Sequence, residues 1–460
     1  MKLVSTRGHG DAVDLRTAVF SGLAPDGGLY LPETISPLGE PALDDLRGRS
    51  LPEIGARVAR HLIQDEFPGD VIQELVESAL NFPIPLVALD DGSYVLELFH
   101  GPTGSFKDVG ARFLAGLVGR FRAEMDQDVI VLVATSGDTG GAVAHAFHKE
   151  PGIRTVVLFP EGKVSPVQRR QLTEVGGNVE PVAVRGTFDD CQRLVKKGIA
   201  DRSLKRTAVI ASANSINVGR LLPQSFYYFH AWGQIPASEG VPVFSVPSGN
   251  LGNLTGGALA RFLGLPVAGF LAATNVNDTV VRFLETGELD PNPAVQTLSS
   301  AMDVARPNNL ERLLSLYDDD WMGLSREVRG SSHTDDETLG AIRRVYEEQG
   351  YLMDPHTAVG WLALTRARER GRGRGAGGVG TVGAASGGRA LAVGDAPGII
   401  LSTASPAKFP ETVERATGIE PDWKSMLPEG ASEEGEASVT EIDPDYDELL
   451  PILEGVPASQ

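Results

Sequence analysis

The sequence of 460 residues contains a single cysteine, Cys191. One thiol excludes an intrachain disulfide and any metal site built from several cysteines, and it favours a reducing compartment, so we expect a cytoplasmic protein. No run of about eighteen apolar residues occurs, and no membrane-spanning helix is therefore predicted. The first residues lack the apolar segment of a secretory signal peptide, so we expect no export.

Basic residues are also scarce. The chain has 41 Lys and Arg against 61 Asp and Glu, for a formal net charge of −20. This balance argues against wholesale nucleic-acid binding but permits a local cationic pocket for a small anion. The histidines His100, His145 and His356 are isolated in the sequence, so metal ligation has little support. No spacing indicates a Ser-His-Asp set.

Apolar runs with strand composition alternate with helical periodicity along most of the chain. Strands alternating with helices predict an α/β protein with parallel, doubly wound sheets. Ligands of such sheets bind at the carboxyl ends of the strands, where all the motifs described below fall. The predicted strands are 94–99, 128–135, 153–159, 179–186, 241–247, 266–275 and 398–404.

The chain divides into four expected regions: a mainly helical region over 1–90, two α/β domains over 91–230 and 231–425, and an acidic tail over 426–460. Residues 370–397 are rich in glycine. Their Arg-Gly steps are typical of RNA-binding tails, but we interpret them as a flexible surface loop. The tail has no basic residue, which predicts a solvated and partly disordered segment.

Lys107 lies at the centre of the stretch HGPTGSFKDVGARF, residues 100–113. Thr103 or Ser105 can cap a helix start, and apolar residues at four-residue steps follow, so Lys107 is expected in the first helical turn. The positive end of the helix and any burial would lower the pKa of its ammonium. A partly neutral lysine suits imine chemistry with an aldehyde cofactor, whereas the alternative is a solvated surface lysine.

A glycine-rich turn follows the predicted strand that ends near residue 247. Glycines let the backbone approach an anion, and the N–H groups of the helix start then point at it, which predicts a phosphate cup. The turn lacks the lysine of a Walker motif and does not fit GxGxxG. A purely structural turn is the alternative. The residues of this turn are Gly249, Asn250, Leu251, Gly252 and Asn253.

Other polar loops offer further candidate binding residues. The turn SGDTGG, residues 136–141, could hold a substrate carboxylate or phosphate, or could simply cap a helix. The loop SANSINVGR, residues 212–220, and the turn PEGKVSP could bind a small anion or satisfy loop backbone. The candidates are Ser136, Gly137, Asp138, Thr139, Lys163, Asn217 and Arg220.

These motifs together resemble the threonine synthase family. The segments ELFHGPTGSFKD, ATSGDTGGAVAHAF, SANSIN, VPSGNLGNLTGG, AATNVNDTVVRFL, TLSSAMDVARPNN and STASPAKFPETVE occur in that family's order. The resemblance runs from the N-terminus to about Gly418, apart from the glycine-rich insert. It is strongest to the longer-chain branch and implies the fold-type-II architecture of pyridoxal-phosphate enzymes, similar to the β subunit of tryptophan synthase.

The resemblance also implies roles for individual residues. Lys107 matches the lysine that forms the Schiff base with pyridoxal 5'-phosphate, and the turn 249–253 matches the loop that binds the cofactor phosphate. Thr403 matches the residue near the pyridine nitrogen, which a hydroxyl leaves unprotonated more readily than a carboxylate would. The turn 136–139 matches a loop facing the amino-acid substrate. Asn217, Arg220 and Lys163 are weaker candidates for the substrate phosphate.

The implied reaction converts O-phospho-L-homoserine and water to L-threonine and phosphate by γ-elimination and β-addition of water. Lys107 would remove the α-proton once the substrate amine has displaced it. Two phosphates must be held at once, and the two glycine-rich turns meet that need. A lid that closes over the site is expected, because carbanions must be shielded from water. The expected partner is the small substrate alone, for a monomer or homodimer.

Four positions depart from the family pattern, and other functions stay open. The family usually has a bulky apolar residue at Gly104, Phe at Leu251, Asp at Asn253 and His at Ser405. One alternative is a dehydratase or β-replacement enzyme on the same fold that acts on serine or threonine. A second is a non-catalytic homologue that binds a phospho-ligand, and a third is an Arg-Gly RNA-binding protein.

Overall fold

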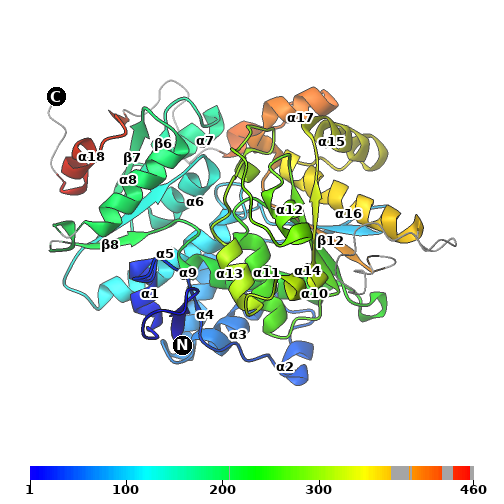
Figure 1. Cartoon of the computed structure of the whole chain (residues 1–460), viewed down its shortest axis with the longest axis horizontal. Helices are drawn as coiled ribbons and strands as arrows, with labels where there is room; N and C mark the ends of the chain where they lie inside the picture. The colour runs from blue at the N-terminus through cyan, green and yellow to red at the C-terminus, as the bar shows by residue number, and fades with distance from the viewer. Residues whose placement is uncertain (202, 207, 374–392, 394–395, 427–438, 456–460) are drawn as a thin grey trace.

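The computed structural model of the chain contains two α/β units that lie side by side, with the N-terminal helices along one edge (Figure 1). It describes all residues except 202, 207, 374–392, 394–395, 427–438 and 456–460. Among the described helices, none combines the length and the apolar character that a membrane span requires. A short antiparallel pair, β1 (Leu3–Ser5) and β2 (Tyr30–Pro32), lies near the N-terminus.

Within the described residues, the larger sheet has six strands: β3 (Leu86–Ala88), β4 (Ser93–Glu97), β9 (Val243–Pro247), β10 (Gly269–Thr274), β11 (Val328–Ser332) and β12 (Gly398–Ser402). Their order is β11-β10-β9-β12-β4-β3, and only the edge strand β3 is antiparallel to its neighbour. The strands that precede Lys107, the glycine-rich turn and Thr403 are therefore neighbours, although they are far apart in the sequence.

The smaller sheet has five strands in the part of the chain that the structure describes: β5 (Val129–Ala134), β6 (Ile153–Pro160), β7 (Val179–Val184), β8 (Val209–Ser212) and β13 (Thr440–Ile442). Their order is β13-β7-β6-β5-β8, and every pair is parallel. All six residues of β5 are buried. Val131 packs into one hydrophobic cluster and Leu132 into another, because successive side chains point to opposite faces of a strand. A continuous apolar run therefore fits this strand.

Helices cover both faces of each sheet. One face of the smaller sheet carries α8 and α18, and the helices α5, α6 and α7 lie on the other (Figure 1). The larger sheet is covered by α15 and α16 on one face and by α10 and α11 on the other. The helices are α1 (Leu15–Ser21), α2 (Glu40–Asp44), α3 (Leu51–Ile63), α4 (Gly69–Ala79), α5 (Lys107–Ala123), α6 (Asp138–Phe147), α7 (Pro166–Thr173), α8 (Phe188–Ala200), α9 (Val218–Leu221), α10 (Phe226–Gln234), α11 (Gly252–Phe262), α12 (Thr279–Thr286), α13 (Leu310–Leu316), α14 (Trp321–Glu327), α15 (Asp335–Gln349), α16 (Pro355–Gly373), α17 (Pro410–Thr417) and α18 (Tyr446–Leu453).

The doubly wound α/β architecture predicted from the sequence is confirmed. The four region limits stay a proposal. The strands β3 and β4 begin the expected first α/β domain or precede it, yet β4 pairs with β12 of the larger sheet. Chain order alone does not say which sheet a strand joins, because parallel neighbours are brought together by long crossover connections.

The C-terminal region differs from the solvated acidic tail that the charge run suggested. Strand β13 pairs with β7, and α18 packs on α8 with Leu449 and Leu453 buried. The acidic residues that come before these apolar positions, Asp445, Asp447 and Glu448, hid the periodicity of a short amphipathic helix. The glycine-rich segment 370–397 falls largely outside the described residues, although α16 continues to Gly373.

Candidate active site

The predicted motifs meet at the carboxyl ends of the strands of both sheets. Residues 402–405, at the end of β12 and just after it, run beside residues 98–106, which follow β4. The Phe106 N–H donates to the Thr403 carbonyl at 3.0 Å, and the Ser405 N–H donates to the Gly104 carbonyl at 2.9 Å. These bonds place Thr403 next to the start of α5, as the sequence led us to expect for a site at the strand ends.

Helix α5 begins at Lys107, as predicted, but its start is capped differently. The N-cap is Phe106, and the Lys107 N–H reaches the Ser105 hydroxyl only at 3.4 Å. The buried carboxylate of Asp108 accepts bonds from the Thr103 N–H at 2.9 Å and from its hydroxyl at 2.7 Å. Asp108 therefore closes the turn from inside the helix, and Thr103 is its partner and not the cap.

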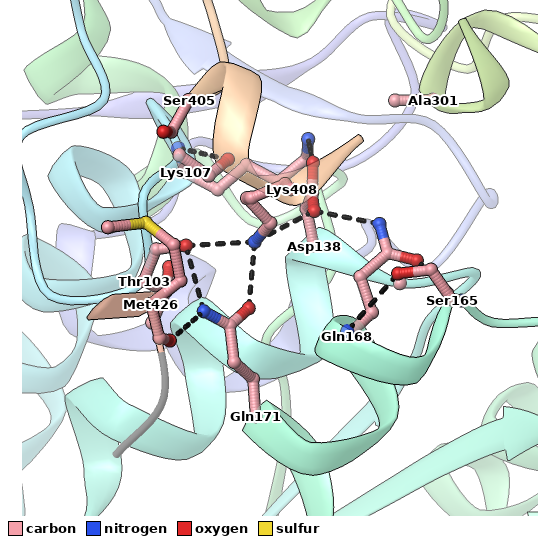
Figure 2. A network of polar contacts seen from close by, with 12 residues as sticks. Thr103, Lys107, Asp138, Ser165, Gln168, Gln171, Ala301, Ser405, Lys408 and Met426 are labelled. Atoms are coloured by element: carbon pink, nitrogen blue, oxygen red, sulfur yellow. Dashed lines mark hydrogen bonds and ion pairs between the residues drawn. The ribbon is translucent and has the colours of Figure 1, made fainter. Parts of the chain in front are cut away.

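Lys107 shares one carboxylate with a second lysine (Figure 2). Its amine lies 3.4 Å from Oδ2 of Asp138, whose Oδ1 is 2.9 Å from Nζ of Lys408. Gln168 donates a further bond to the same Oδ1 at 2.9 Å. The Lys107 side chain is 13% exposed, whereas those of Asp138 and Lys408 are buried. The structure therefore brings together Lys107 from α5, Asp138 from the 136–141 turn and Lys408 from the segment after β12.

Burial and neighbouring charges shift the pKa values of Lys107 and Asp138. Removal from water lowers the pKa of Lys107, the Asp138 carboxylate opposes that effect, and the positive charges of Lys408 and Arg220 add to it. Burial alone would raise the pKa of Asp138. The charges of Lys408 and Lys107, with hydrogen bonds from Lys408 and Gln168, outweigh it and hold the carboxyl pKa well below its usual range. The arrangement therefore places an amine of lowered pKa, Lys107, beside the ionised carboxylate of Asp138.

The backbone of the glycine-rich turn is open to an anion. Among the described residues, none supplies a hydrogen-bond acceptor to the backbone N–H groups of 249–254. Leu251 adopts φ +60°, in the left-handed region, which turns the chain into α11. A Cβ on Gly249 would lie 2.5 Å from the Ala301 carbonyl oxygen, so only glycine fits there. This geometry matches the predicted phosphate cup.

The side chains of the turn serve the protein itself. Asn250 donates to the Ser215 hydroxyl at 2.9 Å and accepts from the Asn308 N–H at 2.5 Å. Asn253 Oδ1 accepts from the hydroxyls of Tyr227 and Tyr228 at 2.7 and 2.8 Å. The Asn253 side chain therefore faces two tyrosines. An anion bound in the cup would accept hydrogen bonds from the backbone N–H groups of the turn and not from this side chain.

The three side chains predicted to bind the substrate phosphate, Asn217, Arg220 and Lys163, have different surroundings in the structure. Arg220 is 5% exposed, its Nη1 donates to the Ala213 carbonyl, and its buried Nε has no partner among the described residues. Burial lowers the pKa of its guanidinium to about 10. The Asn217 amide donates to the carbonyls of Val19 and Ser212, both at 2.8 Å, and its Oδ1 caps α9. Asn217 thus caps a helix, and both amide hydrogens of its side chain donate within the protein.

The remaining predicted residues lie at the rim. Lys163 is exposed on the turn after β6, and no hydrogen bond or ion pair in the described part of the chain links it to the Lys107 group. Ser136 is exposed and Thr139 is half-buried, at the mouth of the turn that carries Asp138. A Cβ on Gly137 would lie 2.5 Å from the Gln168 side chain, so this glycine admits the residue that holds Asp138.

Two buried basic residues near the site, Lys408 and Arg312, were not predicted from the sequence. Lys408 stands in the STASPAKF segment, but one lysine in a sequence gives no sign of being buried. Arg312 is also buried, and its guanidinium donates to the carbonyls of Tyr30, Ser215 and Ile216. It thereby ties the 212–220 loop to the N-terminal region. No local sequence pattern predicts these contacts of Arg312, because its partners are backbone carbonyls that are far away in the sequence.

The residues present fit pyridoxal phosphate. The cofactor requires an amine of lowered pKa, a cradle of free N–H groups for its phosphate and a hydrogen-bonding group for its ring nitrogen. Lys107, the 249–254 backbone and Thr403 offer these three features at the ends of neighbouring strands.

Comparisons with known proteins agree with this geometry. Residues 79–383 match the family described as pyridoxal-phosphate dependent enzyme. Residues 2–80 match the threonine synthase N terminus, and residues 380–449 match the threonine synthase C-terminal family. The fold and the site thus define a pyridoxal-phosphate-dependent enzyme of fold type II.

Individual relatives narrow the assignment. Threonine synthase of Escherichia coli strain K12 is 40% identical over 432 residues, which cover 94% of each chain. A crystal structure of threonine synthase from Escherichia coli has a TM-score of 0.86 at 38% identity and covers 99% of this chain and all of that one. A structure of PLP-bound threonine synthase from Brucella melitensis has a TM-score of 0.85 at 33% identity, with full coverage of both chains. The chain belongs to the threonine synthase family, and the family, enzyme class and cofactor expected from the sequence are confirmed.

Proposed function

We propose that the site around Lys107 converts O-phospho-L-homoserine and water to L-threonine and phosphate. One observation carries this proposal: a buried amine of lowered pKa lies beside an ionised carboxylate, with the incompletely paired guanidinium of Arg220 close enough to influence it. An amine can bind an aldehyde cofactor and move protons, and the second cation can bind a phosphate ester.

The cofactor would be held by Lys107 through its amine, by the backbone of 249–253 through its phosphate and by Thr403 at its ring nitrogen. When bound, pyridoxal phosphate supplies an electron sink for carbanions on the amino-acid carbons. Lys107, once released by the substrate amine, would take the α-proton. The ammonium that results lies within ion-pair distance of Asp138 Oδ2, at 3.4 Å, so the carboxylate would stabilise the proton on that nitrogen.

The substrate phosphate would bind Arg220. Its Nη1 donates to the Ala213 carbonyl, whereas its Nε, which has no partner among the described residues, would donate to a phosphate oxygen. Ser136 and Thr139 would orient the amino-acid part of the substrate at the mouth of the site. We propose no substrate role for Asn217, whose amide is occupied, and only a rim position for Lys163.

The test is the visible absorption spectrum of the purified protein with pyridoxal phosphate, before and after O-phospho-L-homoserine. We expect a cofactor band that shifts on addition of substrate, with release of phosphate and threonine, and loss of that band in Lys107→Ala. A protein that binds no cofactor would overturn the proposal. A band that is indifferent to phosphohomoserine but responds to serine or threonine would transfer the function to a dehydratase.

Three finer expectations belong to the same proposal. We propose a cytoplasmic enzyme whose only partner in the reaction is its small substrate, present as a monomer or homodimer. We also retain the proposed regions 1–90, 91–230, 231–425 and 426–460, with β3 and β4 joined to the sheet of the third region. Light scattering of the purified chain would measure the oligomeric state directly.

A further inference from the structure

Lys408 is a fully buried lysine with a complete set of acceptors. It ends the short 3-10 turn η5 (Pro406–Lys408), which follows β12. Its Nζ donates to the Thr103 carbonyl and to the Gln171 side-chain oxygen, both at 2.8 Å, and pairs with Asp138 at 2.9 Å (Figure 2). An ammonium has three N–H groups, and all three are used within the protein. Lys408 thus has no donor left for a ligand.

The charges around Lys107 do not balance while its amine is protonated. Lys107, Lys408 and Arg220 are cations, and Asp138 is the carboxylate that faces both lysines. The buried carboxyl of Asp108 also interacts with Lys408, but its removal from water raises its pKa and so opposes its negative charge. A buried excess of positive charge is costly, and it falls when one cation loses its proton. Lys408 has three acceptors, including the carboxylate at 2.9 Å, whereas Lys107 has the longer carboxylate contact of 3.4 Å and the Phe106 ring, whose centre lies 4.8 Å from its Nζ. Lys107 is therefore the group from which the proton leaves most easily.

We propose that Lys408 is a positioning residue for the reaction, which holds Asp138 ionised with Oδ2 turned toward Lys107 and thereby keeps the Lys107 amine ready to release its proton. This proposal rests on the proposed role of Lys107. Without the Lys408 charge, Asp138 would be left with Lys107 as its one lysine partner, and the pair would retain the proton. Gln168 and Gln171 complete the arrangement, because Gln168 holds the other side of Asp138 Oδ1 and Gln171 holds Lys408.

The test measures the proton affinity of Lys107 in the full chain freed of cofactor. Only a neutral amine reacts with acetic anhydride, so the labelling of Lys107 against pH, followed by peptide mass spectrometry, gives the midpoint of its titration. Lys408→Met is expected to raise that midpoint by roughly 1 pH unit or more, the usual effect of one close charge. The double variant Lys408→Met with Asp138→Asn removes both charges, and its midpoint is expected to return toward that of the unchanged chain.

A second variant offsets the positive charge of Lys408 without removing this lysine. Gln171→Glu places a carboxylate on the Lys408 ammonium, and it is expected to raise the Lys107 midpoint in the same direction. Lys424→Met, at an exposed lysine of the same C-terminal region, is the matched control and should leave the midpoint in place. In the cofactor-loaded enzyme, Lys408→Met should shift the acidic limb of the kcat profile upward with little change in KM.

The outcomes separate this inference from the proposed function. If borohydride traps no cofactor on Lys107 of the unchanged chain, the proposed role of Lys107 fails, whatever the midpoints are. If cofactor is trapped there but Lys408→Met and Gln171→Glu leave the midpoint in place, Lys408 has a structural role alone. A midpoint that rises in Lys408→Met and stays raised in the double variant would also overturn the inference, because charge compensation requires its return.

Discussion

The backbone N–H of Ser405 donates to the carbonyl of Gly104 at 2.9 Å, so two positions that depart from the family pattern lie against each other beside Lys107. Gly104 adopts φ +65°, and a Cβ there would lie 2.6 Å from the sulfur of Met426. Met426 belongs to the 3-10 turn η6 (Trp423–Met426). Its side chain fills the space above Gly104 that a larger residue would need, and Ser405 caps the turn that carries Lys408. Both departures from the family pattern therefore fit their surroundings: Gly104 leaves room for Met426, and Ser405 supplies a helix cap.

Gly104→Ala is expected to destabilise the protein more than a glycine substitution without crowding. Gly92 also has a left-handed φ, of +75°, but nothing lies within 4 Å of its Cβ position. Gly92→Ala should therefore cost about 1 kcal/mol, the strain of that conformation. Gly104→Ala should cost roughly twice as much, and adding Met426→Ala should relieve the difference. Thermal unfolding of the four proteins measures this; equal losses for both glycines would contradict it.

Gly249→Ala is expected to weaken cofactor binding strongly. The new Cβ would lie 2.5 Å from the Ala301 carbonyl oxygen, and backbone cannot swing aside as a side chain can. Gly252→Ala is the matched control on the same turn, since its nearest neighbour would be the Asn309 side chain at 3.6 Å. Titration with pyridoxal phosphate should show at least about a tenfold loss of affinity for Gly249→Ala, as expected from one displaced charge-assisted contact. Equal affinity of the two variants would remove the turn from the cofactor site.

Arg220→Gln is expected to raise the KM for O-phospho-L-homoserine by roughly 10- to 100-fold, the worth of a hydrogen bond to a charged group. The cofactor band should keep its position and intensity, because the guanidinium is assigned to the substrate phosphate. Steady-state kinetics with the absorption spectrum as control measure both effects. A loss of kcat at unchanged KM would instead point to an effect on Lys107, whose pKa the Arg220 charge helps to lower.

Stability is expected to fall in mild acid because of His333. Its side chain is buried beside Ser331, and burial lowers its pKa from an ordinary 6.5 to about 4. The unfolded chain binds a proton below pH 6.5 and the folded chain only below pH 4. The free energy of unfolding should therefore decrease as pH falls through this window, by about 3 kcal/mol in total. Denaturant unfolding at several pH values should show a smaller decrease in His333→Asn than in the unchanged chain, and the exposed His9→Asn serves as control.

The sequence predicted the fold and the main chemistry where local signals are strong. The apolar run 128–135 predicted a buried strand, which β5 confirms, and the periodicity after Lys107 indicated the helix that α5 confirms. Side-chain roles within polar loops were harder to predict. Asn217 and Arg220 are three residues apart at the start of α9, yet the Asn217 amide donates to two backbone carbonyls, whereas Arg220 keeps a buried nitrogen without a partner in the described part of the chain. That difference depends on what packs against each residue, which spacing does not encode.

The sequence by itself determined the alternation of strands and helices, the family and the lysine at the start of α5, because periodicity, glycine-rich turns and motif order are local properties of the chain. Only the tertiary structure decided that Lys107 shares Asp138 with Lys408, that Asn253 faces Tyr227 and Tyr228, and that β13 and α18 join the smaller sheet. Those contacts join residues that are far apart in sequence. Burial makes their charges and hydrogen bonds matter, since only packing removes the water that would otherwise screen them.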